Sequence, residues 1–353
     1  MNLLITGGAG FVGGSLAIFL KQKHPAYKIT CFDNLKRRGS ELNLNRLKHH
    51  GIEFIHGDIR NKEDFDQLGE THSIIDASAE PSVLAGINGS TDYVVNTNLM
   101  GTINCLNFAA RSKSNFLFLS TSRIYPIDSL NKIAYKEEKT RFTIESAQVL
   151  AGVTARGIAE NFPKEGARSF YGASKYASEL FIQEYQEFFQ LKTVINRFGV
   201  IAGPWQMGKI DQGVMVLWVA KHFWKQSLSY FGFNGTGKQV RDILHIDDLC
   251  ELIDHQLHNM SMVAGGTFNA GGGLNVSASL CELTELCKKI TGNTIPITPV
   301  REGRQADIPI YITDNTHIEK AIGWTPKRAT EQIVTDIYKW IKENERILSP
   351  ILK

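Results

Sequence analysis

The stretch Thr6-Gly7-Gly8-Ala9-Gly10-Phe11-Val12-Gly13 decides the fold of this chain. The apolar run Asn2 to Thr6 precedes the glycines, and the apolar helical pattern Ser15 to Leu20 follows them. In this strand–turn–helix context, glycines let backbone N–H groups approach a pyrophosphate at the positive end of the helix dipole. A tight turn without a ligand is the alternative. The stretch therefore predicts the first strand and helix of a dinucleotide-binding fold.

A carboxylate follows the last glycine of that turn by about 20 residues. The next predicted strand, Ile29 to Phe32, ends in Asp33. An acid at this place accepts hydrogen bonds from an adenosine ribose and repels a 2′-phosphate, so NAD is expected rather than NADP. Lys36, Arg37 and Arg38 come next and offer charge for such a phosphate. The other interpretation is a solvated loop with one of these residues near the adenine.

Alternating strands and helices continue along the chain. The runs Glu53 to His56, Ser73 to Ile75, Asn115 to Leu119 and Thr193 to Arg197 are mostly apolar, which is typical of parallel strands buried on both faces. We therefore predict an α/β fold, a Rossmann-type doubly wound parallel sheet with a smaller α/β substrate-binding domain at its C-terminal end. Functional residues should follow the ends of these strands.

Tyr171 and Lys175 stand four residues apart, a spacing that stacks both side chains on one face of a helix. An ammonium near a phenol lowers the phenol's pKa and makes it an acid/base for alcohol chemistry. Taken alone, the pair also fits an aromatic packing beside a solvated lysine. Asn98 stands at the start of the predicted helix that precedes the strand Asn115 to Leu119. It either bridges to the Tyr171 helix or caps its own helix.

Composition narrows the classes of function. The 353 residues carry a formal net charge of +3, with 42% hydrophobic and 21% charged residues. This balance is ordinary for a globular protein and predicts neither a nucleic-acid nor a membrane partner. Five scattered cysteines without a C-x-x-C pair suggest reduced thiols and a cytoplasmic location. We find no cluster with metal-ligand spacing, because Asp247-Asp248 fits a helix cap, and we predict no metal.

These motifs together resemble the extended short-chain dehydrogenase/reductase family, the nucleotide-sugar epimerases and dehydratases. The likeness rests on the glycine turn, Ser120-Thr121 after a buried strand, the Tyr171–Lys175 pair, and Val240-Arg241-Asp242 with His245. It implies that Thr121 bonds the reacting oxygen and that Tyr171 moves its proton. Lys175 would hold the nicotinamide ribose and acidify the tyrosine.

The resemblance also implies two sets of binding residues. The NAD contacts expected from it are Gly7, Gly10, Phe11, Val12, Gly13, Asp33, Asn34, Arg37, Asp58, Ile59, Ala77, Ser78, Ala79, Asn98, Tyr171 and Lys175. The contacts expected to a nucleotide-diphosphate sugar are Glu80, Ser122, Arg123, Gln206, Lys209, Gln212, Arg241 and Arg301. Arg241 is assigned to the diphosphate, because a guanidinium offers two parallel donors; the alternative is a salt bridge with Asp242.

Departures from the family pattern narrow the reaction. The 4,6-dehydratases place Asp-Glu after the threonine, whereas this chain has Ser122-Arg123, so dehydration is not expected. The 4-epimerases usually place asparagine three residues before Gly-Pro, and this chain has Val200 before Gly203-Pro204. Members of the family commonly have a histidine at the end of the fourth strand, where this chain has Asp76. The resemblance is therefore weak ground for giving Asp76 the role of that histidine.

Within the family, the chain is most similar to the 2-epimerases of CDP-sugars. The likeness lies in Lys139 to Thr143, in Gln206 followed by Asp211-Gln212-Gly213, and in Gly237 to Asp242. It implies transient oxidation of the sugar to a keto form and return of the hydride to its other face. The alternatives are epimerisation at C4, as in UDP-galactose or UDP-glucuronate 4-epimerases, and an NAD-sensing protein without catalysis.

The resemblance implies a division of the chain as well. Residues 1–198 plus 238–272 should form the NAD-binding domain, and residues 199–237 plus 273–353 the nucleotide-sugar-binding domain. Ala147 to Ala167 aligns with nothing familiar and is expected where the sugar is enclosed. The helices that begin near Asn98 and Tyr171 would form a homodimer or homotetramer interface, or else face the sheet.

Overall fold

The computed structural model describes residues 1–87, 89–208, 212–303 and 306–353, and these contain a parallel sheet of seven strands. Its strand order is β14-β10-β5-β4-β1-β2-β3, and every neighbouring pair is parallel. The strands are β1 (Asn2–Thr6), β2 (Lys28–Asp33), β3 (Glu53–His56), β4 (Ser73–Asp76), β5 (Asn115–Thr121), β10 (Thr193–Phe198) and β14 (Thr267–Ala270). The order reverses between β1 and β4, which opens a crevice at their carboxyl ends.

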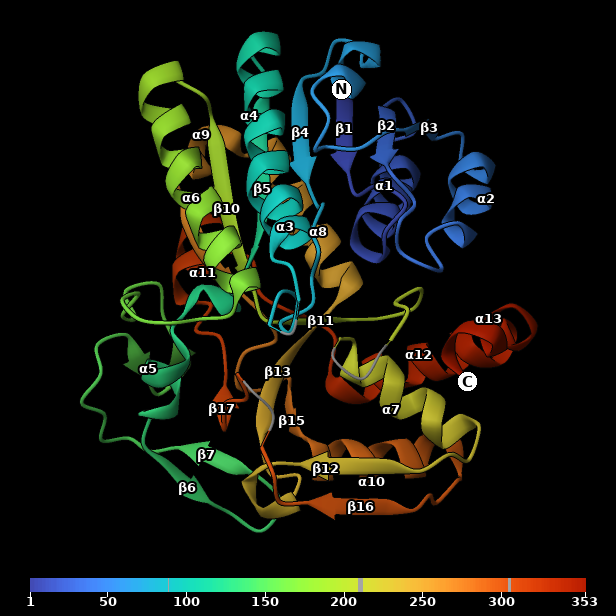
Figure 1. The fold of residues 1–353 in the computed structure, drawn as a ribbon, viewed down its shortest axis with the longest axis vertical. Helices are drawn as coiled ribbons and strands as arrows, with labels where there is room; N and C mark the ends of the chain where they lie inside the picture. The colour runs from blue at the N-terminus through green and yellow to red at the C-terminus, as the bar shows by residue number, and fades with distance from the viewer. Residues whose placement is uncertain (88, 209–211, 304–305) are drawn as a thin grey trace.

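Apolar side chains on both faces of this sheet hold two layers of helices. In β1, Leu3 and Ile5 pack into one core and Leu4 packs into the other, as the two-residue period of a strand requires. The first core includes α1 (Phe11–Lys23), α8 (Ile246–His258) and α11 (Thr316–Ile322). The opposite core includes α4 (Gly101–Ser112) and α6 (Phe170–Phe189), which Figure 1 shows on the other face of the sheet from α8.

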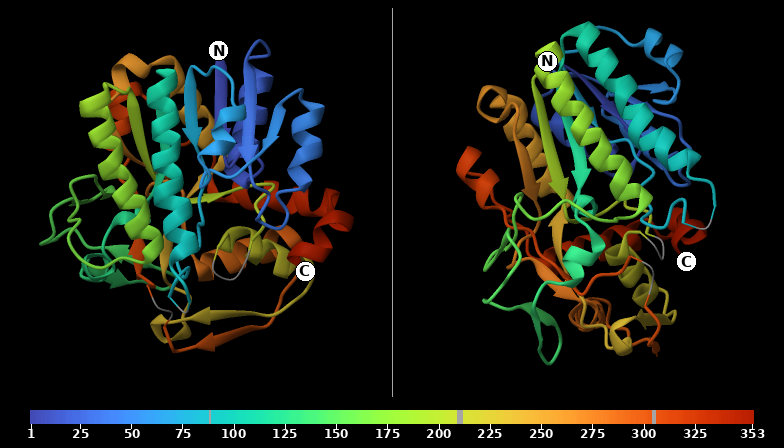
Figure 2. Two further views of the ribbon diagram at one scale, coloured as in Figure 1. Left: turned by 45° about the horizontal axis from the view of Figure 1, so that its top comes forward. Right: turned by 60° about the vertical axis from the view of Figure 1, so that its left-hand side comes forward.

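A smaller layer faces the carboxyl ends of the large sheet (Figure 1). It holds α7 (Val214–Phe223), α10 (Leu280–Thr291), α12 (Thr330–Glu343), α13 (Glu345–Leu352) and the parallel pair β12 (Leu228–Phe231) and β16 (Ile297–Val300). Trp218, Leu283, Ile337 and Trp340 belong to its own apolar core. Figure 2 shows the same separation from two further directions, with the chain's N-terminus far from this layer and its C-terminus within it.

A second small sheet connects the two layers. It is formed by β11 (Val200–Ala202), β13 (Val240–His245), β15 (Ser277–Ser279) and β17 (Ile310–Tyr311), with β13 at its centre. Thus β13 pairs in the small sheet, whereas α8 and β14, which follow it, lie with the large sheet. The domain boundaries expected from the resemblance stay a prediction.

The remaining described elements are short. They are α2 (Leu42–His49), η1 (Glu63–Gln67), α3 (Asp92–Val95), the π-helical turn η2 (Asn96–Met100), η3 (Ser122–Ile124), α5 (Ile127–Asn131), β6 (Tyr135–Glu137), β7 (Phe142–Ile144), β8 (Val153–Thr154), β9 (Gly157–Ile158), η4 (Phe233–Gly235) and α9 (Met260–Val263). Among the described helices, none combines the length and apolar character that crossing a membrane requires.

Candidate active site

The glycine turn brings β1 and α1 into close contact. The Gly10 N–H donates to the Gly7 carbonyl at 2.9 Å, and Gly7 has a left-handed φ of +63°. A β-carbon on Gly13 would lie 2.3 Å from the Gly7 oxygen, so only glycine permits this approach. Gly10 caps α1 without a side-chain hydrogen bond, which leaves the first N–H groups of the helix for an anion. This cradle fits the pyrophosphate of a dinucleotide.

Asp33 ends β2 beside the same turn. Its carboxylate accepts hydrogen bonds from the Ala9 N–H at 3.1 Å and from the Leu35 N–H at 2.8 Å. Burial raises the pKa of Asp33, and the backbone N–H groups oppose that rise. Asp33 is therefore fixed beside the glycine turn, and its contact with an adenosine ribose stays a prediction.

The adenosine side continues to Asp58. Asn34 donates to Asp58 at 2.9 Å, and Arg60 donates to both of its oxygens at 2.9 and 2.6 Å. Burial acts against ionisation here, but the bonds from Arg60 and Asn34 outweigh it and bring the pKa of Asp58 to about 2. Arg60, which the sequence interpretation missed, thus fixes the Asp58 carboxylate.

A cavity of about 270 Å³ opens at the carboxyl edge of the large sheet. It collects residues that the sequence interpretation assigned to the cofactor, the catalysis and the substrate. They are Phe11, Val12, Ala77, Ala79, Thr121, Ser122, Arg123, Tyr171, Lys175, Gln206, Gln212 and Arg241. We call it the reaction cavity.

Tyr171 lies in the first turn of α6, which begins at Phe170 behind the cap Ser169. The Ser169 hydroxyl accepts from the Gly172 N–H at 3.2 Å. Burial raises the pKa of Tyr171, while a hydrogen bond with Thr121 and the charge of Arg123 lower it. The role expected of Lys175 in acidifying Tyr171 stays a prediction. Arg123 is the charged neighbour that favours the phenolate.

Lys175 is buried one helical turn farther along α6. Its Nζ lies 3.9 Å from the centroid of the Phe118 ring. Burial lowers the pKa of Lys175 to about 8, and the carboxylates Asp76 and Glu179 oppose this effect. Lys175 is therefore not the solvated lysine of the alternative interpretation, and two carboxylates support its charge.

Both carboxylates are fixed by hydrogen bonds. Asp76 accepts from Thr6 Oγ1 at 2.7 Å and from Thr102 Oγ1 at 2.9 Å. Glu179 accepts from Ser120 Oγ at 2.6 Å and forms a buried ion pair with Arg197 at 2.7 Å. The sequence interpretation missed Glu179, although its place four residues after Lys175 puts both on one face of α6.

Asn98 bridges to α6 and does not merely cap its own helix. Its Nδ2 donates to Ser174 Oγ at 3.2 Å and to the Glu80 carbonyl at 3.1 Å, and its own carbonyl accepts from Ser178 Oγ at 2.7 Å. Asn98 lies in the π-helical turn η2, a feature frequent at functional sites. Its Oδ1 accepts from the Glu80 N–H at 2.7 Å. Asn98 thus joins the segment after β4 to the Tyr171 helix.

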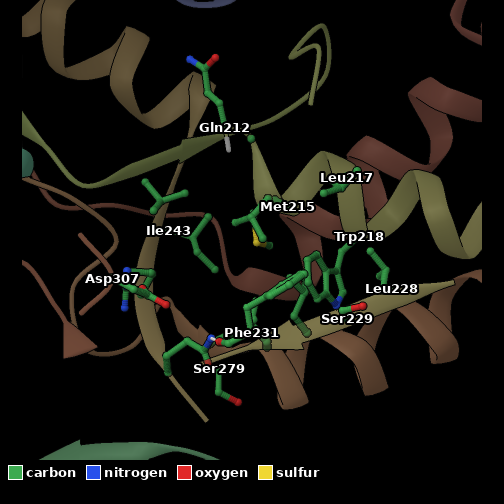
Figure 3. A pocket seen from close by; sticks show the side chains of 18 of the residues that line it. Gln212, Met215, Leu217, Trp218, Leu228, Ser229, Phe231, Ile243, Ser279 and Asp307 are labelled. Carbon is green, nitrogen blue, oxygen red and sulfur yellow. Dashed lines mark hydrogen bonds and ion pairs between the residues drawn. The ribbon is translucent and has the colours of Figure 1, made fainter. Parts of the chain in front are cut away.

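A second cavity of about 500 Å³ continues from the first into the smaller layer (Figure 3). We call it the nucleotide cavity, and its apolar wall is formed by Met215, Leu217, Trp218, Leu228, Phe231 and Ile243. Ser229, Gln239 and Ser279 add polar groups to that wall. Its size and mixed lining suit a flat base and a ribose.

Two arginines line both cavities, Arg123 and Arg241. Arg241 donates to Asp307 at 3.0 Å and to the Ile308 carbonyl at 2.7 Å. Its ion pair is therefore with Asp307, not with Asp242 as the alternative interpretation had it. Burial lowers the pKa of Arg241 to about 10, and Asp307 opposes this, so the guanidinium stays charged at neutral pH. A diphosphate at this junction would meet two cations.

Some expected residues lie elsewhere. Arg301 is exposed and is not among the described residues that line either cavity, and Lys209 lies outside the described residues. Glu80 is bonded to Asn98 and Ser82 and is not among the residues that line the reaction cavity. No described residue of 147–167 lines either of these two cavities, and the expectation that this segment encloses the sugar stays a prediction.

The segment 147–167 has a structural place instead. Phe162 is fully buried and packs edge-on against Tyr125, which stacks with Tyr311. Glu160 accepts from the Asn269 N–H at 2.7 Å. The segment therefore supports Tyr311, a wall of the reaction cavity, from behind.

The sequence interpretation missed one cluster of two histidines and a carboxylate that could hold a metal ion. Candidate ligand atoms of His24, Asp254 and His258 lie within 4.8 Å of one another. Asp254 pairs with Lys23 and His24, each at 2.8 Å, and His258 Nδ1 contacts the Asp254 carbonyl at 2.8 Å. Because these side chains already form ion pairs or hydrogen bonds within the protein, we still predict that no metal binds here. His24 lies 230 residues from Asp254, so no sequence spacing signals the cluster.

Comparison with known proteins agrees with this geometry. The model of the NAD dependent epimerase/dehydratase family matches residues 3–271. CDP-paratose 2-epimerase of Salmonella typhi is 33% identical, over 96% of this chain and 99% of that protein. UDP-glucose 4-epimerase of Halalkalibacterium halodurans is 28% identical, over 98% of this chain and 96% of that protein.

A solved structure shows the same fold. UDP-glucuronic acid 4-epimerase from Bacillus cereus, in complex with UDP-glucuronic acid and NAD, has a TM-score of 0.79 at 22% identity, over 97% of this chain and 99% of that chain. The predicted α/β fold, the enzymatic function and NAD as cofactor are confirmed. With its glycine cradle, its Thr121–Tyr171–Lys175 cavity and this match, the chain belongs to the NAD dependent epimerase/dehydratase family, and it resembles members that act on nucleotide sugars.

Proposed function

We propose that this enzyme is a nucleotide-sugar epimerase that inverts C2 of a CDP-sugar. The conversion of CDP-paratose to CDP-tyvelose is a reaction of this type. The observation that carries the proposal is the reaction cavity itself. Thr121, Tyr171 and Lys175 meet there, while the two positions after Thr121 hold Ser122 and Arg123. Elimination of water needs an acid and a base at such a place, so the cavity supports oxidation without dehydration.

Each residue has a distinct part in the reaction. The glycine cradle would hold NAD, which would supply an acceptor and donor of hydride for the sugar. Tyr171 takes the hydroxyl proton of the sugar and gives it back, and Thr121 holds the reacting oxygen in line with Tyr171. Arg123 favours the tyrosinate, and the buried Lys175 adds positive charge beneath the site. The cycle leaves every group as it began, as an epimerase requires.

Inversion needs the keto sugar to turn over between the two hydride transfers. The nucleotide cavity, with about 500 Å³ and the arginines at its mouth, would hold the nucleotide diphosphate meanwhile. The reaction cavity is smaller and has apolar walls at Val200, Ile201 and Ile308. These apolar walls offer no hydrogen bond from their side chains to the sugar, which favours its rotation about the diphosphate.

The choice of C2 and of cytosine is supported by the relative at 33% identity. The second candidate is a 4-epimerase of UDP-sugars, which the relative at 28% identity favours. An NMR screen of CDP-, UDP-, GDP- and dTDP-sugars separates the two. We expect inversion at C2 of a CDP-sugar, and inversion at C4 of a UDP-sugar would replace our proposal with the second candidate.

We also propose that the enzyme is a cytoplasmic homodimer or homotetramer. Helix α6 exposes Leu180, Phe181, Phe188 and Phe189, which a partner would cover. The cysteines are free, and four of the five are buried, in keeping with a reducing compartment. Light scattering after size exclusion should give at least twice the chain mass, and Phe181→Glu should lower it to that of the single chain.

A further inference from the structure

The segment after Asp33 reaches across to the loop that borders both cavities. Arg37 donates through Nη1 to Gln212 Oε1 and through Nη2 to the Met207 carbonyl at 3.1 Å. Gln212 lines the reaction cavity and the nucleotide cavity. Figure 3 shows its side chain pointing away from Met215 and Trp218 of the nucleotide cavity. The resemblance assigned Arg37 to the cofactor and Gln212 to the substrate, and the fold joins them directly.

A second connection runs beside the first. Asn43, which is buried, donates to the Ala9 carbonyl of the glycine turn at 2.8 Å and accepts from Arg46 at 2.5 Å. The Arg46 guanidinium lies 4.0 Å from the centroid of the Trp205 ring, in the loop that carries Met207. Trp205 has a left-handed φ of 72°, which a residue other than glycine keeps only where its contacts enforce it.

Both connections start at the dinucleotide cradle and end on described residues of the stretch after Pro204. The first starts two residues beyond Leu35, whose N–H donates to Asp33, and the second starts at Ala9 in the glycine turn. The first connection ends at Met207 and at Gln212, which lines both cavities, and the second ends at Trp205. A ligand that fixes the cradle would thereby also fix Trp205, Met207 and Gln212 for the next ligand.

We propose that Arg37 is a positioning residue that couples NAD binding to nucleotide-sugar binding through Gln212. The inference rests on the proposed function, because it takes the two cavities as the sites of cofactor and nucleotide sugar. Coupling of this kind is reciprocal: NAD tightens the nucleotide, and the nucleotide tightens NAD by the same factor. Arg37 would thus act on the nucleotide-sugar site, whereas Asp33, which lies close to it in the sequence, would contact the adenosine of NAD.

The chain offers a matched control in the next residue. Arg38 also crosses between the layers, but its Nη2 donates to the Pro350 carbonyl at 2.6 Å, in α13. Neither Arg38 nor Pro350 lines either of the two cavities. Arg38→Ala removes the same charge and one contact between the layers while leaving the contacts of Trp205, Met207 and Gln212 in place.

Calorimetric titration of protein freed of dinucleotide tests the coupling. The affinity for CDP is measured with and without saturating NAD, and the affinity for NAD with and without saturating CDP. For the wild type and Arg38→Ala we expect each ligand to tighten the other by the same factor, about fivefold or more. For Arg37→Ala and Gln212→Ala the factor should fall toward one, and the double variant should lose no more than either single one.

Two results overturn the inference. One is a wild type that binds CDP equally well with and without NAD, and the other is an Arg37→Ala protein with the coupling of Arg38→Ala. Gln212→Ala removes the same hydrogen bond by changing the acceptor residue. If Arg37→Ala fails to fold, the test can therefore still be made with Gln212→Ala. If the wild type binds none of CDP, UDP, GDP and dTDP, the proposed function fails first, and the coupling fails with it.

Discussion

Gly172 stands so close to Arg123 that a β-carbon on Gly172 would lie 2.1 Å from the Arg123 carbonyl oxygen. This approach sets the first turn of α6 against the end of β5 and brings Tyr171 within a hydrogen bond of Thr121. Gly172, which carries no side chain, therefore helps to set the position of Tyr171 relative to Thr121.

Gly172→Ala should displace α6 and separate Tyr171 from Thr121. We expect turnover to fall at least tenfold and the free energy of unfolding to fall by about 1 to 3 kcal/mol, because the added methyl overpacks a backbone contact. Steady-state kinetics and urea unfolding measure the two effects. Gly69→Ala is the control, because a β-carbon there meets nothing within 4 Å; equal losses in both variants would contradict the packing argument.

Tyr171→Phe removes the proton carrier and leaves the ring in place. Turnover should fall about 10²- to 10⁴-fold, the usual contribution of a positioned acid/base. The variant should keep its NAD, since the glycine cradle is unchanged, and absorbance of the purified protein reports this. Unchanged turnover in Tyr171→Phe would contradict the assignment of the proton transfer to Tyr171.

Arg241→Ala tests the assignment of the diphosphate. Loss of a charged donor at the junction of the cavities should raise KM for the nucleotide sugar at least tenfold and change kcat much less. The control is Arg156→Ala, an exposed arginine that pairs with Glu319 at 2.6 Å away from the cavities. An unchanged KM in Arg241→Ala would show that the diphosphate does not bind at Arg241.

The buried Lys175 predicts a particular dependence of stability on pH. Its pKa is lowered from 10.5 to about 8, so the folded state binds fewer protons than the unfolded state between these values. By linkage, the free energy of unfolding gains from this group as pH rises from about 8 to 10.5, by on the order of 3 kcal/mol. Lys175→Met lacks the gain, so the wild type should rise relative to it in urea unfolding between pH 7.5 and 10. Parallel pH profiles would show that Lys175 is not desolvated.

The predictions that held were those that local sequence determines. The glycine turn, Asp33 at the end of β2 and the pair on α6 each need only a strand end or one helical turn. The cavity also gathers Thr121 with that pair, because parallel strands end at one edge of a sheet.

What could not be predicted depends on contacts between distant segments. Asp307 lies 66 residues from Arg241, and Gln212 lies 175 residues from Arg37. No spacing rule links such positions. Likewise the sign of the pKa shift of Tyr171 follows from burial, which the four-residue spacing to Lys175 does not reveal. The segment 147–167 could not be placed, since its role is to pack behind Tyr125 and Tyr311.

Turnover of CDP-paratose in heavy water, followed by NMR, tests most directly whether this enzyme epimerises by transient oxidation. A hydride that passes to NAD and back never exchanges with solvent. The account predicts CDP-tyvelose, inverted at C2, with no deuterium at that carbon. Deuterium at C2 of the product would show enolisation, and would contradict the mechanism assigned to Thr121, Tyr171 and Lys175.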